Sequence, residues 1–382
     1  MLNIGIIGIG NTGNQIASLG KERLNIPVLA INSSDRDLET VPKDIPRKLI
    51  VTNDTDKQGA GKDRKLAKKY LKSSVTTLIE DKDVVELMDS VDVVFIISST
   101  GGGTGSGISP IMAKIMADKF VDTKVILVGV LPVNGEMLSA HANTLEYLDE
   151  LNTKLPDQTY MLYDNDKYDG LMSSYKILEQ VNNDIISDLD VLRCTYNYTT
   201  KYNSIDDRDM MRLISFSGRL IVARLEDFKE KDADTVTIED MLIDRLKRNS
   251  HVEFQRDKKI MGSGLITNLS QPLMDEFDDN IPKVVDFIGD AIHGFIHEYV
   301  TADRKEPNNV FLILAGLSPI NDKILKINDR IAEIEKNQQV LLDDNAIDKE
   351  NLNALSNKIA DTDTVKSEKS VNIQDIFADF DS

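Results

Sequence analysis

The sequence predicts an α/β protein with a parallel-sheet domain followed by a smaller α+β domain. Three observations support this. Short, near-continuous apolar runs alternate with helical stretches over the first 170 residues, as in a parallel sheet covered on both faces. Two glycine-rich stretches each follow such a run directly. After about residue 200 the alternation gives way to strands and helices in a different order.

Six apolar runs in the first half are predicted strands. They are residues 2–9, 26–32, 47–52, 91–98, 124–132 and 159–164. Helical patterns occupy 62–80, 108–120 and 137–152, and a first helix follows the first strand. We therefore assign residues 1–170 to a Rossmann-like parallel-sheet domain.

A longer helix then separates the two halves of the chain. Apolar residues recur at helical spacing over 171–193, and we assign 171–200 to a central core helix. Strands at 218–226, 258–269, 295–302 and 309–317, with helices at 237–248 and 282–293, indicate a smaller α+β domain over 201–320. A C-terminal helix is expected within 321–345. The polar, aromatic-poor tail over 346–382 is expected to be disordered.

Composition narrows the classes of function. Of the 382 residues, 45 are Lys or Arg and 64 are Asp or Glu, which gives a net charge of −19. Such a surface repels nucleic acid, so we expect no direct nucleic-acid binding and find a basic partner easier to accommodate. A single cysteine, Cys194, fits a reducing cytoplasm. The chain shows no signal peptide and no membrane-length apolar run, so we expect a cytoplasmic protein without membrane contact.

The first glycine loop follows the first strand. Gly8, Gly10 and Gly13, with Asn11 and Thr12 between them, match the pattern G-x-G-x-x-G. Glycine lets the backbone approach a phosphate closely, and the helix that follows offers free N–H groups to an anion. An NAD-dependent oxidoreductase is one interpretation. Its acidic ribose ligand should end the second strand, where Asn32 stands instead.

The second glycine loop follows the fourth strand and has no role in the oxidoreductase interpretation. Five glycines and two hydroxyl residues make up the stretch Gly101, Gly102, Gly103, Thr104, Gly105, Ser106 and Gly107. Ligands of open parallel sheets bind outside the carboxyl ends of the strands. The two loops together therefore predict a cradle for a di- or triphosphate, to which Thr104 and Ser106 add hydroxyl donors.

This second loop resembles the characteristic GGGTG[ST]G loop of the tubulin/FtsZ superfamily, and a looser similarity extends over about residues 1–320. The resemblance implies a GTPase that binds GTP or GDP, with Mg²⁺ accompanying the nucleotide, and assembles head-to-tail with itself into filaments. We find no dedicated protein ligand for a metal. The sparser first loop, the acidity and the tail resemble the TubZ-type partition tubulins of plasmids and phages. A cell-division filament of the FtsZ type is the alternative.

The resemblance places further residues around the nucleotide. They are Asn14 in the first loop; Asn32 and Ser33 after the second strand; Gly61, Lys62 and Arg64 in the loop that senses the γ-phosphate; Pro132 and Glu136 near the ribose; and Asn165 and Asn183 at the guanine. An asparagine both donates and accepts, as the guanine edge requires. Lys62 and Arg64 are alternatively the solvated start of a helix, and Asn183 is alternatively solvent-facing.

The resemblance also implies a catalytic loop that acts on the nucleotide of the next subunit. Asp206 and Asp209 have the i, i+3 spacing of the superfamily's acidic pair. Ser204 stands where cell-division members carry Asn, and Asn203 is one residue away. Carboxylates in this position orient an attacking water. The alternative is a helix N-terminus capped by aspartate.

The end of the tail carries an apolar helical pattern. Ile373, Ile376, Phe377 and Phe380 fall at i, i+3, i+4 and i+7, among acidic residues. We expect a short helix that binds a partner's groove, and the resemblance implies that this partner is a basic DNA-binding adaptor. The alternative is a helix that docks on its own domain.

Overall fold

The computed structural model describes residues 2–51, 57–193, 206–228, 236–253, 260–278, 281–288, 295–301, 308–343 and 373–381. Its strands form one ten-stranded sheet in the order β3-β2-β1-β4-β5-β6-β7-β10-β8-β9. They are β1 (Ile4–Ile9), β2 (Val28–Asn32), β3 (Arg47–Leu49), β4 (Val93–Ser99), β5 (Lys124–Leu131), β6 (Thr159–Asp164), β7 (Gly218–Phe228), β8 (Gly262–Leu269), β9 (Phe295–Thr301) and β10 (Asn308–Leu317). Every predicted strand is confirmed, and the fold class is the predicted one.

The first six strands are parallel and form a doubly wound sheet. Its helices are α1 (Gly10–Leu24), α2 (Asp35–Glu39), α3 (Arg64–Glu80), α4 (Lys82–Asp89), α5 (Thr104–Lys119) and α6 (Leu138–Thr153). The strand order reverses between β1 and β4, which are neighbours. This switch point places the loops after β1 and β4 side by side, where ligands of such sheets bind.

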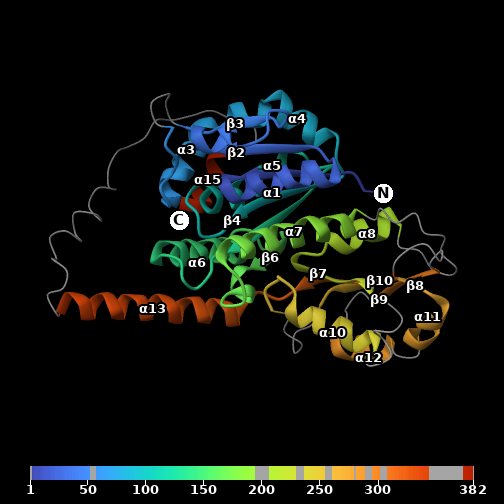
Figure 1. Ribbon diagram of the computed structural model, residues 1–382. Coiled ribbons are helices and arrows are strands. Elements are labelled where there is room, and N and C mark those ends of the chain that lie inside the picture. Colours follow the sequence, from blue (N-terminus) through green and yellow to red (C-terminus); the bar gives the residue numbers. More distant parts are fainter. Residues whose placement is uncertain are drawn as a thin grey trace.

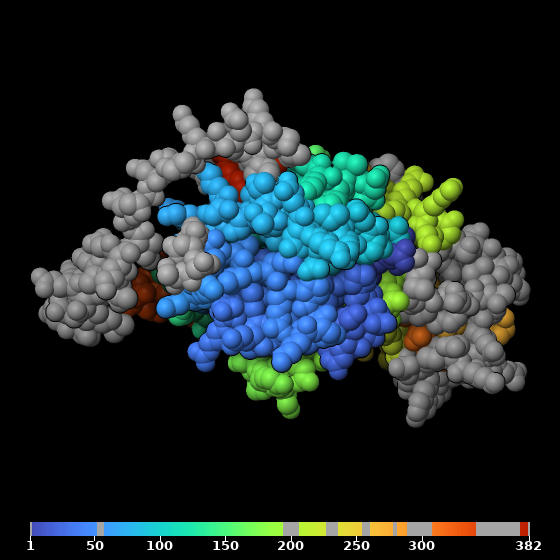
Figure 2. Space-filling model, turned by 90° about the horizontal axis from the view of Figure 1, so that it is seen from above, coloured from blue at the N-terminus to red at the C-terminus, as the bar shows by residue number. Residues whose placement is uncertain are grey.

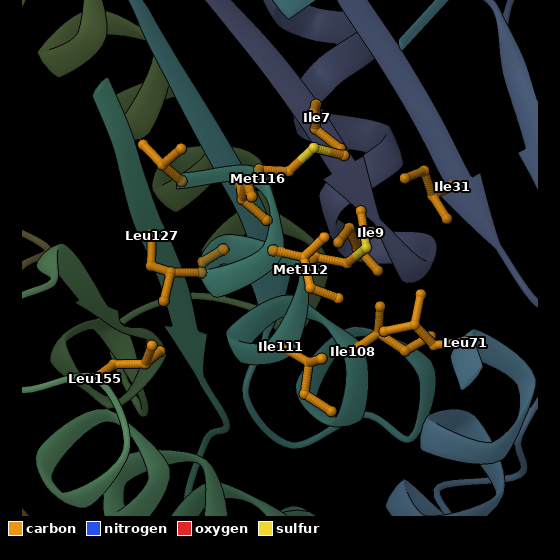
Figure 3. Packing of buried hydrophobic residues seen from close by; sticks show 14 of the residues in the cluster. Ile7, Ile9, Ile31, Leu71, Ile108, Ile111, Met112, Met116, Leu127 and Leu155 are labelled. Atoms are coloured by element: carbon orange, nitrogen blue, oxygen red, sulfur yellow. The ribbon is translucent and has the colours of Figure 1, made fainter. Parts of the chain in front are cut away.

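Alternate residues of each strand feed two apolar layers, one on each face of the sheet. On one face Ile7 and Ile9 of β1 join a cluster with Leu71 of α3 and with Ile108 and Met112 of α5 (Figure 3). On the other face the intervening β1 residues pack with α1 and with α7 (Ser174–Leu192). Burial on both faces explains why the strands are continuous apolar runs rather than alternating ones.

Helix α7 crosses the molecule from one edge of the sheet to the other (Figure 1). It begins shortly after the 3₁₀ turn η1 (Asn165–Tyr168), at the carboxyl end of β6. It ends beside the amino end of β1, where the Arg193 carbonyl accepts a hydrogen bond from the Leu2 N–H at 3.1 Å. Helix α8 (Asp207–Ile214) follows at this amino edge. Just beyond it, the Phe216 carbonyl accepts a bond from the Thr159 hydroxyl at the start of β6.

The second half of the chain extends the same sheet. Strand β7 pairs with β6 through Thr159–Gly218 and Tyr160–Arg219, and β10 lies antiparallel to β7 and β8. Helices α10 (Ile238–Arg248), α11 (Gln271–Asp278) and α12 (Ile281–Ile288) belong to this half. Helix α13 (Asn321–Asp343) then extends away from the sheet, below α6 in Figure 1. Among the described residues, none of the helices is both long and apolar enough to traverse a bilayer.

The end of the tail forms the predicted helix, α15 (Ile373–Asp381). The helix lies on its own domain, beside α3 and α5 (Figure 1), with Ile376, Phe377 and Phe380 buried in the same apolar cluster as those helices. Docking on its own domain is thus the alternative that the structure adopts. Seen from above, the first hundred residues cover the centre of the molecule (Figure 2). The side chain of Ile373 and the rest of the tail lie outside the described residues.

Candidate functional site

The two glycine loops meet at the switch point of the sheet. Gly10 has a φ of +74°, and a Cβ on it would lie 3.2 Å from the backbone nitrogen of Gly105. Both conditions favour glycine. The residues from Gly8 to Asn14 end β1 and form the first turn of α1, and those from Gly101 to Gly107 join β4 to the first turn of α5. The structure therefore brings together the predicted residues of both loops, and the N-termini of two helices converge there.

A third loop closes against the second. A Cβ on Gly103 would lie 2.8 Å from the Cα of Lys62, so the backbone of this loop rests directly on the glycines. Asn143 of α6 holds the contact, because its Nδ2 lies 2.9 Å from the Lys62 carbonyl oxygen and 3.1 Å from that of Gly102. Sequence reasoning missed Asn143. Its only signal is a polar residue on a helix face that turns out to be buried.

The hydroxyls of the second loop already bond within the protein. The Thr104 hydroxyl lies 2.6 Å from that of Ser33, which follows Asn32 at the end of β2, and the Ser106 hydroxyl donates to the Gly102 carbonyl. These bonds tie the loop after β2 to the loop after β4. The donors left for an anion are the backbone N–H groups of the first turns of α1 and α5, which have no partner within their helices.

Two buried asparagines, Asn14 and Asn165, have side-chain amide atoms without a hydrogen-bond partner among the described residues. Asn14, in the first turn of α1, is 2% exposed, and neither its Oδ1 nor its Nδ2 makes a hydrogen bond within the described part of the chain. Asn165, at the end of β6, is also buried with an unpartnered Oδ1. Buried polar atoms normally have partners. These amides fit a ligand that donates and accepts hydrogen bonds, such as a nucleobase or a sugar.

Lys62 lies near the mouth of the site, and Arg64 lies within the domain. Lys62 Nζ is 3.4 Å from Glu136 Oε2, which joins the third loop to the loop that starts at Pro132 after β5. Arg64 is 3% exposed, and its guanidinium pairs with Glu150 of α6. The expectation that Arg64 neutralises phosphate is therefore not met, because its charge is already paired inside the domain.

Proline explains part of the position of Arg64. Pro110 lies within α5 and has no N–H to donate to the carbonyl of Ser106, four residues earlier. Arg64 Nη1 donates to that carbonyl instead, at 2.7 Å. The carbonyl that lacks its helix hydrogen bond thus accepts the bond that joins α3 to the glycine loop.

Asn183 is not brought to the loops. Its Oδ1 accepts a bond of 2.9 Å from Arg23, in the last turn of α1 and about 20 Å along that helix from Gly10. Tyr175 lies in the first turn of α7, which follows η1 in the chain, and is 75% exposed. Sequence reasoning did not single out Tyr175.

The loop that carries Asn165 is fixed from α13. Lys323 Nζ lies 3.0 Å from Asp164 and 2.7 Å from Asp166, on either side of Asn165. Asp166 also accepts a bond of 2.6 Å from the Asn134 N–H, in the loop after β5. Burial raises the pKa of Asp164, and the Lys323 charge opposes that rise. One lysine thus holds two of the loops at the site.

The predicted acids lie at the opposite edge of the sheet. Asp206 caps α8, with its Oδ1 accepting from the Arg208 and Asp209 N–H groups at 2.8 and 2.9 Å. Asp209 Oδ2 lies 3.5 Å from the Asp206 nitrogen, which completes a capping box. Asp206 is exposed and Asp209 is half-buried at the amino edge, whereas the glycine loops lie at the carboxyl edge. Asn203 and Ser204 lie outside the described residues.

Within the described ranges, no group of three or more His, Cys, Asp or Glu side chains is arranged to hold a metal ion. A Mg²⁺ ion carried by a triphosphate would depend mainly on phosphate and water oxygens. The donor set around the loops, backbone N–H groups and amides, suits the anionic ligand itself.

Comparison with known proteins agrees with this geometry. Residues 3–172 match the Tubulin/FtsZ family, GTPase domain. Over 188 residues the chain is 29% identical to the tubulin-like protein CetZ of Thermococcus kodakarensis, a match that covers 47% of this chain and 48% of that protein. The chain thus spans about half the length of the curated relatives it matches.

Two solved structures show the likeness of the whole fold. TubZ of Clostridium botulinum phage c-st, truncated at its C-terminal tail, superposes with a TM-score of 0.69 at 19% identity, covering 88% of this chain and 98% of that one. CetZ2 of Haloferax volcanii, in a GTPγS-bound protofilament, gives 0.72 at 17% identity, covering 87% and 100%.

The fold and the converging loops define a protein of the doubly wound α/β class with a glycine-loop site at the switch point of its sheet. More particularly, the chain has the tubulin/FtsZ fold, and its residues 3–172 match the model of the Tubulin/FtsZ family GTPase domain.

Proposed function

We propose that this chain is a GTPase that assembles head-to-tail and hydrolyses GTP at the contact between subunits. The separation of the two half-sites carries the proposal. The phosphate-binding loops end β1 and β4, whereas Asp206 and Asp209 lie at the other edge of the same sheet. Strand β5 alone sets these edges roughly 25 Å apart, so one chain cannot bring its own acids to its own loops.

Each group in the proposed site has one task. Backbone N–H groups and the two helix N-termini hold the phosphates, and Lys62 neutralises part of their charge. Asn14 and Asn165 bind the nucleoside through their unpartnered amide atoms. Asp206 and Asp209 of the neighbouring subunit orient the attacking water. Mg²⁺, brought by the nucleotide, offsets the remaining phosphate charge.

Assembly is tested by light scattering with GTP, GDP and a slowly hydrolysed GTP analogue. We expect GTP and the analogue to produce polymer and GDP to produce little. Absence of polymer with every guanine nucleotide would remove the filament from the proposal, and nucleotide binding is measured separately by calorimetry.

The acids are tested with Asp206→Asn and Asp209→Asn. Asparagine caps a helix about as well as aspartate, so these changes remove the carboxylate and keep α8. We expect phosphate release to fall at least about a hundredfold, which is the lower end of the range for loss of a general base. Nucleotide binding should be unchanged. Asp207→Asn, an exposed neighbour, is the matched control. Wild-type phosphate release in both variants would leave the aspartates as caps only.

We further propose that the filament positions plasmid or phage DNA in a cytoplasm through a basic adaptor that binds the tail. The likeness to phage c-st TubZ supports this role, as do the net charge of −19 and the acidic, aromatic α15. Deleting residues 371–382 is expected to abolish adaptor binding and to spare GTP hydrolysis at saturating GTP. Adaptor binding by the truncated chain would contradict this role of the tail.

A further inference from the structure

Helix α15 occupies a surface on its own domain that we name the tail groove, formed by α3 and α5. Phe377 is 1% exposed, and Ile376 and Phe380 are 8% and 7% exposed. Two lysines of α3 border these rings: Lys72 Nζ lies 5.7 Å from the centre of the Phe377 ring, and Lys68 Nζ lies 5.9 Å from that of Phe380. The contact is apolar at its centre and cationic along α3.

Lys68 links the tail groove to the nucleotide loops. Its Nζ donates to the Phe380 carbonyl at 2.9 Å and lies 2.8 Å from Glu150 Oε1. The other oxygen of Glu150 accepts from Arg64 Nη2, and Arg64 Nη1 donates to the Ser106 carbonyl in the glycine loop. Arg64 is also the first residue of α3, directly after the loop that contains Lys62. We call Lys68, Glu150 and Arg64 the relay.

We propose that the tail groove is the binding site of the chain's own α15, and that a guanine nucleotide strengthens this docking through the relay. The second statement rests on the proposed function. Phosphate in the cradle orders the Lys62 loop and fixes Arg64, which in turn fixes Glu150 and Lys68 in the geometry that holds Phe380. The docked tail and the nucleotide then favour the same arrangement of α3, and each strengthens the binding of the other.

Docking by a helix this short is reversible. Helix α15 has nine residues and buries three apolar side chains, so the gain from burial is comparable with the entropy lost when the segment is ordered. The apolar face of α15 is therefore buried in the docked state and available to another partner in the undocked state. Nucleotide occupancy sets the balance between the two states.

Hydrogen exchange in the full chain, followed by mass spectrometry, tests docking. We expect amides of 376–381 to exchange at least about tenfold more slowly than in the free peptide 371–382. Phe377→Ala together with Phe380→Ala should raise exchange to the peptide rate, whereas Ala378→Gln, at an exposed position of α15, should not. Peptide-like exchange in the wild-type chain would overturn the proposal. Protection that rises with protein concentration would also overturn it, because the tail would then belong to a neighbouring copy.

The relay is tested by repeating the exchange with saturating GTP analogue. Protection of α15 should rise several-fold, and Lys68→Met should remove this rise, while Lys69→Met, an exposed lysine of the same helix, should keep it. Reciprocity requires the double phenylalanine variant to bind the analogue more weakly by the same factor. If the analogue binds and protection does not change, the relay is wrong and the GTPase proposal stands. If no guanine nucleotide binds, the proposed function and the relay fail, and docking is still measured without nucleotide.

Discussion

At the scale of single residues, the site is defined by polar groups that the free protein leaves unsatisfied. Asn14 has a buried amide whose two polar atoms have no hydrogen-bond partner among the residues that the structure describes. Such a group destabilises the free chain and is useful only when a ligand bonds to it. The residue therefore trades stability for recognition.

Asn14→Leu should therefore have opposite effects on the stability of the free chain and on its affinity for GTP. An apolar side chain of similar size removes the unsatisfied amide, so the free chain should be more stable by about 1 kcal/mol. Binding of GTP should weaken by about tenfold, the equivalent of one lost hydrogen bond. Thermal unfolding without nucleotide and calorimetric titration measure the two effects. Glu22→Gln, at an exposed position near the other end of α1, should change neither. A variant that is both less stable and a normal binder would contradict this view of Asn14.

The sequence reveals some of these residues and hides others. The glycines of both loops could be predicted, because a loop whose backbone is approached closely is rich in glycine. Asn143 and Arg64 could not be placed, because their roles depend on which face of α6 is buried and on the carbonyl that Pro110 leaves free. Asn183 was misplaced for the same reason: its neighbour Arg23 is distant in sequence.

At the scale of elements, α13 has a role that its solvated pattern does not reveal. Lys323 is the contact from this helix to both aspartates around Asn165. Lys323→Met should therefore loosen this loop and weaken GTP binding by about tenfold, or 1.4 kcal/mol. Calorimetry measures the change, and Lys326→Met, an exposed lysine one turn further, is the control. Equal affinity in the two variants would show that α13 does not support the loop.

A second junction between elements is buried and charged. Asp188 of α7 accepts from Arg224 of β7 at 2.6 Å and lies 2.8 Å from His251. Burial alone would raise the pKa of Asp188, but the positive charge of Arg224 and the hydrogen bond from His251 outweigh it and lower the pKa below its ordinary value of 3.8. The carboxylate therefore joins the core helix to the second half of the sheet.

Asp188→Asn should lower the free energy of unfolding at pH 7 by about 3–5 kcal/mol, because it breaks a buried pair. A depressed pKa stabilises the fold above the pKa of the unfolded chain, and the contribution is lost as pH falls through the folded value. Denaturant unfolding should show a constant difference from wild type between about pH 5 and 8 and a shrinking one below that range. Burial raises the pKa of Asp190 on the same helix, so Asp190→Asn should not destabilise. A wild-type advantage that grows in acid would contradict this assignment.

Strands and long helices with a clear hydrophobic pattern could be predicted from the sequence, whereas short helices and the location of α15 could not. All ten strands follow from apolar runs, and the long helices from their periodicity. Helices α2 and α4 have only five and eight residues, so each offers few turns over which a helical period can repeat. The helix at α15 could be predicted from Ile376, Phe377 and Phe380, but its location could not, because the tail groove is formed by α3 and α5 together.

At the scale of the whole molecule, the two half-sites give the chain a direction. The loops face one way along the strands and the acids face the other, so identical contacts between successive copies in the proposed filament would produce a polar strand. The same arrangement makes the half-sites separable by mutation.

Complementation follows from this separation. Asp206→Asn with Asp209→Asn leaves a chain that binds GTP without acids, and Gly103→Val leaves a chain with acids whose loop clashes with Lys62. Each variant alone should release almost no phosphate. Their mixture should regain a measurable fraction of the wild-type rate, because some contacts pair intact loops with intact acids. A colorimetric phosphate assay measures the rate and sedimentation confirms that the variants copolymerise. Copolymers that remain inactive would argue against a shared site.

Because the loops and the acids lie at opposite edges of the sheet, the number of completed sites in a strand of stacked chains is also fixed. A single strand of stacked chains contains one fewer completed site than it has subunits, because the terminal chain whose loops face solvent has no neighbour to supply carboxylates. Under the proposed mechanism, that chain would keep its triphosphate until another copy arrives at its loops. A strand that stops growing would then carry a single unspent nucleotide at the end where the loops are exposed.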